Sequence, residues 1–258
     1  MAAELLSERQ DHTLILTLSN PGLRNALHPD MYAAGIEAFD VIERDDSVRA
    51  VVLTGADQFF CAGGNLHRLL ENRAGERSVQ AESIDLLGAW ISAIRTSTKP
   101  VIAAVEGAAA GAGFSLALAC DLLVAADRAK FVMAYARVGL TPDGGGSWFL
   151  SRSLPRALAS EILLEGKPIE AARLHQAGLV NRVVPAGSAL DHALAWAADL
   201  SQISPSVIAR MKGLIDQAAD QSLSQHLISE RDSFVDALYH RDGLEGISAF
   251  LEKRPARY

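Results

Sequence analysis

The chain has 258 residues, 49% of them hydrophobic, and a formal net charge of −7. This composition supports one sizeable core and argues against nucleic-acid binding, while leaving room for a small anionic ligand held by a few local cations. No apolar stretch reaches the length of a membrane span, and residues 1–12 carry charges where a secretory signal is apolar, so we expect no membrane segment and no signal peptide.

The cysteines and histidines give no sign of a disulfide or a metal site. Cys61 and Cys120 lie in apolar or glycine-rich surroundings, and we expect two unrelated buried thiols in a cytoplasmic protein. The seven histidines show no metal-ligand spacing, so we expect no metal.

The first predicted elements alternate between strand and helix. Residues 12–19 have the alternation of a strand, and a helix is predicted from Pro29 or Asp30 to about Arg44. The apolar run 50–54 predicts the next strand, and a short helix is predicted over 66–70.

The alternation continues toward the middle of the chain. The polar residues 71–78 predict a mobile loop, and 79–96 a long helix. A strand over 101–105, a small-residue helix over 113–119 and a strand over 122–125 follow. Repeated β–α order predicts an α/β fold with a largely parallel sheet and helical crossovers.

The pattern changes after Leu140. A sharp break over 141–146 leads into mostly helical sequence, interrupted by a short strand within 178–185 and ending with a helix over about 243–253. We place a soft boundary near residue 195, which gives a core of residues 1–195 and a helical C-terminal region of residues 196–258.

Two glycine-alanine turns are the most informative feature of the chain. Residues 60–66 follow the strand 50–54, and residues 105–114 follow the strand 101–105. Small residues at such turns let a ligand approach the backbone, and free N–H groups at helix starts can receive an anion. Facing one another, the two turns would form a two-donor oxyanion hole; the alternative is that the small residues only permit tight packing.

Several segments in order resemble the crotonase superfamily, the enoyl-CoA hydratase/isomerase family. The resemblance covers nearly the whole chain and rests on Asn20-Pro21, Arg24-Asn25-Ala26-Leu27, Phe60-Cys61-Ala62-Gly63, Gly107 to Asp121, Ala129-Lys130-Phe131, Gly139-Leu140-Thr141-Pro142 and Ser248 to Arg254. It implies repeated ββα units with a helical C-terminal region, a homotrimer or dimer of trimers, and an acyl-CoA substrate with no cofactor beyond its own CoA.

By position, the resemblance makes Gly64 and Ala112 the two backbone donors to the thioester oxygen. An enolate beside a thioester places its negative charge on that oxygen, so donors there are worth about 10²- to 10³-fold in rate.

The resemblance also implies a CoA site. Arg24 and Lys253 would contact the nucleotide part of CoA, Lys253 in some members from a neighbouring subunit; the alternative is that both are solvated surface cations. Ala62 and Leu66 would touch the adenine and pantetheine portions, and Phe250 belongs to the same C-terminal region. Asn65 replaces an aspartate common in the family and is interpreted as a helix N-cap.

Hydratases of the family use two glutamates, and alignment by the shared motifs places Ser115 and Tyr135 at those two positions. The resemblance therefore implies that Ser115 and Tyr135 line the substrate site. Neither hydroxyl has a pKa low enough to act as a carboxylate base near neutral pH. Asp143 matches the single acid of the isomerase branch, which includes enoyl-CoA isomerases and the 1,2-epoxyphenylacetyl-CoA isomerase of phenylacetate breakdown; the alternative is an ordinary turn residue. Asp121 is interpreted as a structural hydrogen-bonding group, and Glu106 as a turn residue.

We therefore expect an acyl-CoA isomerase that uses Asp143 as acid and base. An enoyl-CoA hydratase and a non-catalytic CoA-binding protein are the alternatives, and hydrolases and dehalogenases share the fold.

Overall fold

A six-stranded sheet lies at the centre of the structure, a computed structural model that describes residues 2–258. Its strands, in spatial order, are β1 (Glu4–Gln10), β2 (Thr13–Ser19), β3 (Ala50–Gly55), β4 (Val101–Val105), β6 (Leu122–Ala126) and β9 (Arg182–Val184). β1 pairs antiparallel with β2, and all later neighbours are parallel. The predicted parallel sheet is confirmed.

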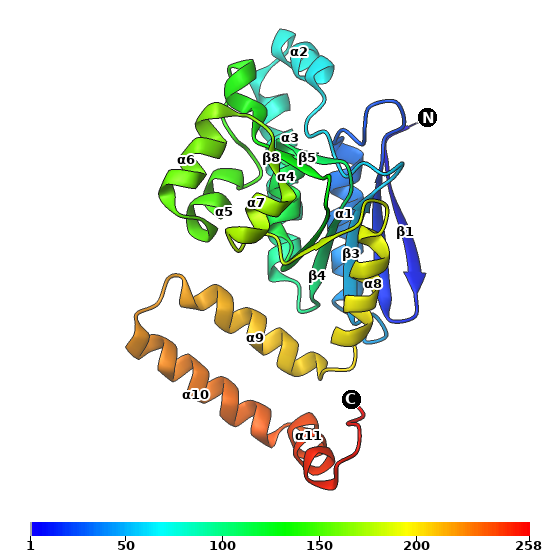
Figure 1. The fold of residues 1–258 in the computed structure, drawn as a ribbon, viewed down its shortest axis with the longest axis vertical. Helices are drawn as coiled ribbons and strands as arrows, with labels where there is room; N and C mark the ends of the chain where they lie inside the picture. Colours follow the sequence, from blue (N-terminus) through cyan, green and yellow to red (C-terminus); the bar gives the residue numbers. More distant parts are fainter. Residues whose placement is uncertain (1) are drawn as a thin grey trace.

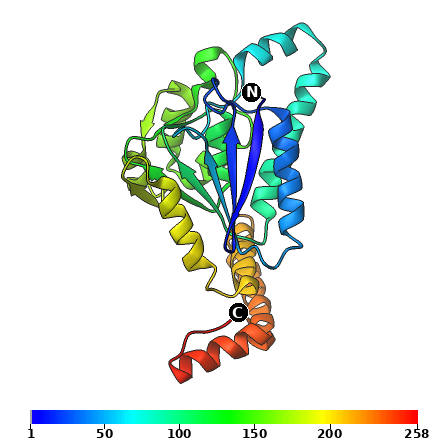
Figure 2. The same cartoon turned by 90° about the vertical axis from the view of Figure 1, so that its right-hand side faces the viewer.

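Helices cover both faces of this sheet (Figure 2). On one face α1 (Pro29–Ile42) and α3 (Arg77–Thr96) pack over alternate strand residues such as Val51 and Leu53. On the other face α8 (Ala189–Leu200) packs on Val52 and its neighbours through buried alanines. Because strand side chains alternate between faces, the continuous apolar run of β3 fits a strand that is buried on both sides.

A second, three-stranded sheet gives the chain its repeated ββα units. It consists of β5 (Ala108–Ala110), β7 (Lys130–Val132) and β8 (Ile169–Glu170). β4 continues into β5 and then into α4 (Ala112–Ala119). The remaining short elements are α2 (Leu66–Ala74), the 3₁₀ helix η1 (Ala134–Val138), α5 (Gly146–Ser153), α6 (Arg156–Glu165) and α7 (Ala171–Gln176).

One predicted loop is wrong. Residues 71–78 are mostly helical, because α2 continues to Ala74 and α3 begins at Arg77. None of the residues of α2 is buried. The polar sequence therefore marks an exposed helix rather than a loop.

The last three helices, α9 (Pro205–Ala218), α10 (Leu223–Tyr239) and α11 (Arg241–Glu252), extend away from the sheet (Figure 1). Residue 195 lies within α8, whose Ala193 and Ala197 are buried against the sheet. The structural division therefore falls after α8, between Leu200 and Pro205, rather than near residue 195.

Both cysteines are free and buried, so the prediction of two unpaired thiols is confirmed. Burial raises the pKa of the Cys61 thiol to about 12, which keeps it protonated near neutral pH. None of the helices within residues 2–258 has the length and hydropathy that a membrane-spanning helix needs.

Candidate active site

A cavity of about 470 Å³ lies where α2, α3 and η1 approach the two glycine turns. Its wall is mainly apolar, with contributions such as Leu27, Leu69 and Ile84. The lining residues on which the description of the site depends are Tyr32, Ala62, Gly64, Leu66, Arg68, Gln80, Ser83, Leu87, Ala112, Tyr135 and Asp143.

Backbone hydrogen bonds hold the two glycine turns side by side. Cys61 N–H donates to Ala108 O at 3.0 Å, and Ala110 N–H donates to Cys61 O at 2.9 Å. Gly63 permits the close approach: its φ is +85°, and a Cβ there would lie 2.5 Å from Ala110 O. This pairing brings Gly64 and Ala112 to one wall of the cavity.

The N–H groups of Gly64 and Ala112 donate no backbone hydrogen bond within residues 2–258. Ala112 is the first residue of α4, where helical N–H groups lack internal partners. The preceding Gly111 has φ 51° and ψ −125°, a backbone conformation that glycine adopts readily and other residues rarely do. This conformation directs the first turn of α4 toward the cavity. The two N–H groups can therefore donate hydrogen bonds to a ligand oxygen that gains negative charge.

Asp143 lies in the same cavity, on the loop after η1. The Tyr135 hydroxyl donates to Asp143 Oδ1 at 2.5 Å. Burial raises the pKa of Asp143 above its ordinary value, and the Tyr135 hydrogen bond opposes that rise. The carboxyl is thus a base held in one orientation and made stronger by its surroundings.

Ser115 lies beneath the cavity wall and does not line it. Its side chain is fully buried, and its hydroxyl donates to the backbone carbonyl of Asp143 at 2.9 Å. Gly144 packs against it, because a Cβ on Gly144 would lie 3.1 Å from Ser115 Cβ and 3.3 Å from Leu87 Cδ2. Ser115 therefore fixes the loop that carries Asp143.

Tyr135 lines the cavity, in agreement with the prediction from its position in the sequence. Its hydroxyl acts there as a hydrogen-bond donor to Asp143. Burial and the negative charge of Asp143 raise its pKa far above the ordinary value of a phenol. Tyr32, on α1, has its pKa raised by the same two causes. Both side chains are neutral donors near neutral pH.

The predicted CoA contacts divide into two groups. Ala62 and Leu66 line the cavity, and Asn65 N-caps α2 by accepting from the N–H of His67 and Arg68 at 3.0 and 3.3 Å. Arg24 is exposed, lies outside the cavity lining, and has its guanidinium 5.7 Å from the centre of the Phe59 ring.

Phe250 and Lys253 lie far from the cavity. α11 is at the opposite end of the molecule from α2 (Figure 1), and the Phe250 side chain is 84% exposed. A single chain does not bring these two residues to the site.

Two other carboxylates that the sequence singled out have structural partners. Asp121 accepts hydrogen bonds from Val101 N–H at 2.8 Å and Lys212 Nζ at 2.6 Å, which ties α9 to the sheet. Glu106 accepts from the N–H of Gly187 and Ala189 and so caps the start of α8. Neither is a lining residue of the cavity.

Sequence patterns did not identify Tyr32, Arg68, Gln80 and Ser83 as site residues. All four lie on helices, and helical periodicity does not show which turn of a helix meets the glycine turns. The polar residue Ser83, on the otherwise apolar buried face of α3, is the one signal that could have drawn attention to that face.

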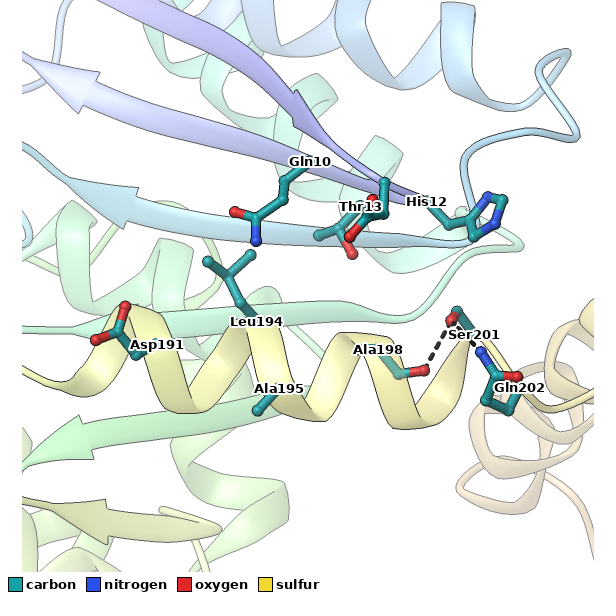
Figure 3. Close-up of a pocket in the computed structure, with 10 residues that line it drawn as sticks. Gln10, His12, Thr13, Asp191, Leu194, Ala195, Ala198, Ser201 and Gln202 are labelled. Carbon is teal, nitrogen blue, oxygen red and sulfur yellow. Dashed lines mark hydrogen bonds between the residues drawn. The ribbon is translucent and has the colours of Figure 1, made fainter.

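A second hollow, of about 500 Å³, lies between the β1–β2 turn and α8 (Figure 3). Its polar groups partly satisfy one another: Ser201 Oγ donates to Ala198 O at 2.7 Å, and Gln202 Nε2 donates to Ser201 Oγ at 3.3 Å. Neither glycine turn reaches it. We therefore take the cavity that holds Asp143 as the candidate active site.

Comparison with known proteins shows the family of the chain. Residues 8–258 match the family described as Enoyl-CoA hydratase/isomerase. The crystal structure of an enoyl-CoA hydratase from Polaromonas sp. JS666 is similar, with 59% identity, a TM-score of 0.97, and coverage of 98% of this chain and 99% of that one.

Two curated relatives from Escherichia coli (strain K12) carry different activity names. A 2,3-dehydroadipyl-CoA hydratase is 36% identical over 252 residues, and a 1,2-epoxyphenylacetyl-CoA isomerase is 36% identical over 255 residues. Each alignment covers 98% of this chain and 97% of the relative.

Proposed function

Because the chain belongs to the enoyl-CoA hydratase/isomerase family and has the crotonase fold, we propose that it is an isomerase that moves a double bond, or opens a ring, beside a CoA thioester. One observation carries the choice of isomerase. Asp143 is the only carboxylate among the cavity-lining residues of the described chain, and two free backbone donors share that cavity with it.

The proposed reaction needs one proton carrier. The thioester oxygen accepts hydrogen bonds from the N–H of Gly64 and Ala112, which stabilise the enolate formed when a proton leaves the acyl chain. Asp143 takes that proton and returns it to another carbon, so the atoms of substrate and product balance without water. Tyr135 holds the carboxylate in place throughout.

The printed names of most relatives support a second candidate, an enoyl-CoA hydratase. Addition of water to a 2-enoyl-CoA needs a base for the water and an acid for the α-carbon. Asp143 supplies one such group, while Tyr135 and the buried Ser115 supply no second carboxylate. A non-catalytic CoA-binding protein is the remaining alternative, and a cavity-lining carboxylate with a raised pKa disfavours it.

The test is a set of assays on one preparation with 3-enoyl-CoA, crotonyl-CoA and epoxyphenylacetyl-CoA. We expect isomerisation of the first or the last and negligible hydration of crotonyl-CoA. Hydration at about 10 s⁻¹ or more, typical of an efficient enzyme, would overturn the proposed mechanism.

For the rest of the CoA site we propose contacts from Ala62, Leu66 and Arg24, with Phe250 and Lys253 contributed by a neighbouring subunit. No cofactor beyond the CoA of the substrate takes part in this scheme. Two free buried thiols suit a reducing compartment, so we propose a cytoplasmic enzyme.

We predict a trimer or a dimer of trimers. The C-terminal helices expose a large apolar surface that needs a partner. Exposed apolar residues there include Met211, Ile215, Leu227, Phe234, Leu244, Phe250 and Leu251. Light scattering at micromolar concentration should give the mass of three or six chains; a monomer would contradict the prediction.

We predict that Tyr135→Phe shifts the acid limb of the kcat/KM profile to higher pH. Asp143 must be ionised to act as a base, and the Tyr135 hydrogen bond lowers its pKa. Loss of that bond raises the pKa, so more alkaline conditions are needed to ionise the carboxyl. Tyr32→Phe is the control, because it removes a cavity phenol that does not bond to Asp143. An unshifted limb in Tyr135→Phe would show that Asp143 does not set this limb.

A further inference from the structure

The wall of the cavity contains a group of polar side chains that the proposed reaction does not use. Arg68 on α2 and Gln80 and Ser83 on α3 all line the cavity, in a wall that is otherwise mainly apolar. A neutral hydrocarbon chain would leave these donors without a partner, which is unfavourable in a confined apolar space.

Arg68 is a partly buried cation with no carboxylate paired to it in the part of the chain that the structure describes. Its Nη1 and Nη2 atoms reach only Ser83 Oγ, at the long distances of 3.5 and 3.4 Å. A guanidinium presents its donors in a planar fork that fits a carboxylate through two parallel hydrogen bonds. Most of the hydrogen-bonding capacity of Arg68 is thus available to a ligand.

The neighbouring groups are also donors. Gln80 Oε1 accepts from Asn72 Nδ2 at 2.7 Å, so the remaining hydrogen-bonding group of this amide is its NH₂. The Ser83 side chain is 6% exposed and lies beside the guanidinium. A cation and nearby donors together specify an acceptor-rich, negatively charged partner.

The position along α3 relates this group to Asp143. Leu87 packs against Gly144, next to the catalytic Asp143. Ser83 lies four residues earlier on the same helix and Gln80 seven residues earlier, which corresponds to about 6 Å and about 10 Å along the axis. The donors therefore lie about one to two helical turns along α3 from the loop that carries Asp143.

Building on the proposed function, we propose that the acyl group of the substrate ends in a carboxylate, and that Arg68 binds it with help from Gln80 and Ser83. The substrate is then the mono-CoA thioester of a short dicarboxylic acid. The direction of one pKa effect agrees with this geometry: the positive charge of Arg68 lowers the pKa of Tyr32, and the negative charge of Asp143 raises it, so Tyr32 lies within reach of both.

The test compares the binding of two saturated thioesters by calorimetry. Adipyl-CoA and hexanoyl-CoA have acyl chains of equal length, and only the first ends in a carboxylate. Neither can isomerise, so the result is independent of turnover and stands even if the proposed isomerase activity fails. We expect Arg68→Met to weaken adipyl-CoA binding by about 10- to 100-fold, while hexanoyl-CoA binds as before or more tightly.

Two further variants define the outcome. Arg73→Met removes an exposed cation from the same helix outside the cavity and should leave both affinities unchanged. Arg68→Lys keeps the charge and should restore part of the adipyl-CoA affinity alone. If Arg68→Met weakens the binding of both thioesters equally and Arg68→Lys restores both, Arg68 binds a phosphate of CoA. If Arg68→Met changes neither affinity, Arg68 binds no anion. Either result overturns the proposal.

Discussion

Replacement of Asp143 by asparagine is expected to lower kcat for isomerisation by about 10²- to 10⁴-fold, the usual contribution of general acid–base catalysis. The amide keeps the size of the carboxyl and can still accept the Tyr135 hydrogen bond. It cannot accept a proton at neutral pH, so transfer between two carbons of the acyl chain stops. The measurement is kcat on 3-enoyl-CoA or on a ring substrate.

Binding should survive this substitution, because the oxyanion donors and the CoA contacts come from other residues. Calorimetry with an unreactive acyl-CoA measures that affinity. Asp127→Asn provides the control, since Asp127 is exposed and does not line the cavity. If Asp143→Asn keeps more than about a tenth of its rate, Asp143 is only a turn residue and the base lies elsewhere.

Replacement of Ala112 by proline is expected to lower kcat/KM by at least about 10²- to 10³-fold, because it removes one of the two oxyanion donors. Proline lacks the N–H and is tolerated at the first position of a helix, which Ala112 occupies in α4. The substitution therefore acts on the donor with little cost to the helix.

The matched control is Arg77→Pro, which places a proline at the first position of α3. Arg77 is exposed, and the preceding Glu76 has ψ 143°, a conformation suited to a residue before proline. Both variants should unfold at nearly the wild-type temperature, and Arg77→Pro should keep its activity. An active Ala112→Pro enzyme would show that the thioester oxygen is bound elsewhere.

The buried strands were predictable because their sequences satisfy one local rule. β3 and β4 are short apolar runs followed by small-residue turns, and burial on both faces produces that pattern without any distant information. The helices over 29–42 and 241–252 were also found close to their observed bounds, because each has apolar residues at helical spacing.

The strands that were missed depend on their partners. β1 has the polar sequence Glu4–Gln10, and it is a strand because it pairs along its length with β2 at the edge of the sheet. β5 and β7 have three residues each, and their short pairing with one another defines them. No local periodicity exists in segments of that length.

In the candidate site, too, some features follow from local sequence and others depend on residues that are distant in the chain. Local sequence marked the two small-residue turns as places where free N–H groups can occur, and the resemblance to the family assigned Gly64 and Ala112 within them. The orientation of Asp143 needed the Tyr135 hydroxyl and the packing of Ser115 beneath its loop, which only the folded chain brings together. Arg68 needed the same information, because none of the residues of its helix is buried and its sequence does not show that Arg68 reaches the cavity.

The central claim is that a single group, Asp143, carries the proton between two carbons of the substrate. Its most direct test is the fate of deuterium placed at C2 of 3-enoyl-CoA during turnover by the wild-type enzyme in ordinary water. One partly buried carrier predicts that a measurable share of the label appears at C4 of the 2-enoyl-CoA product, within the same molecule. Complete loss of the label to water, or a 3-hydroxyacyl-CoA as the main product, would contradict the claim.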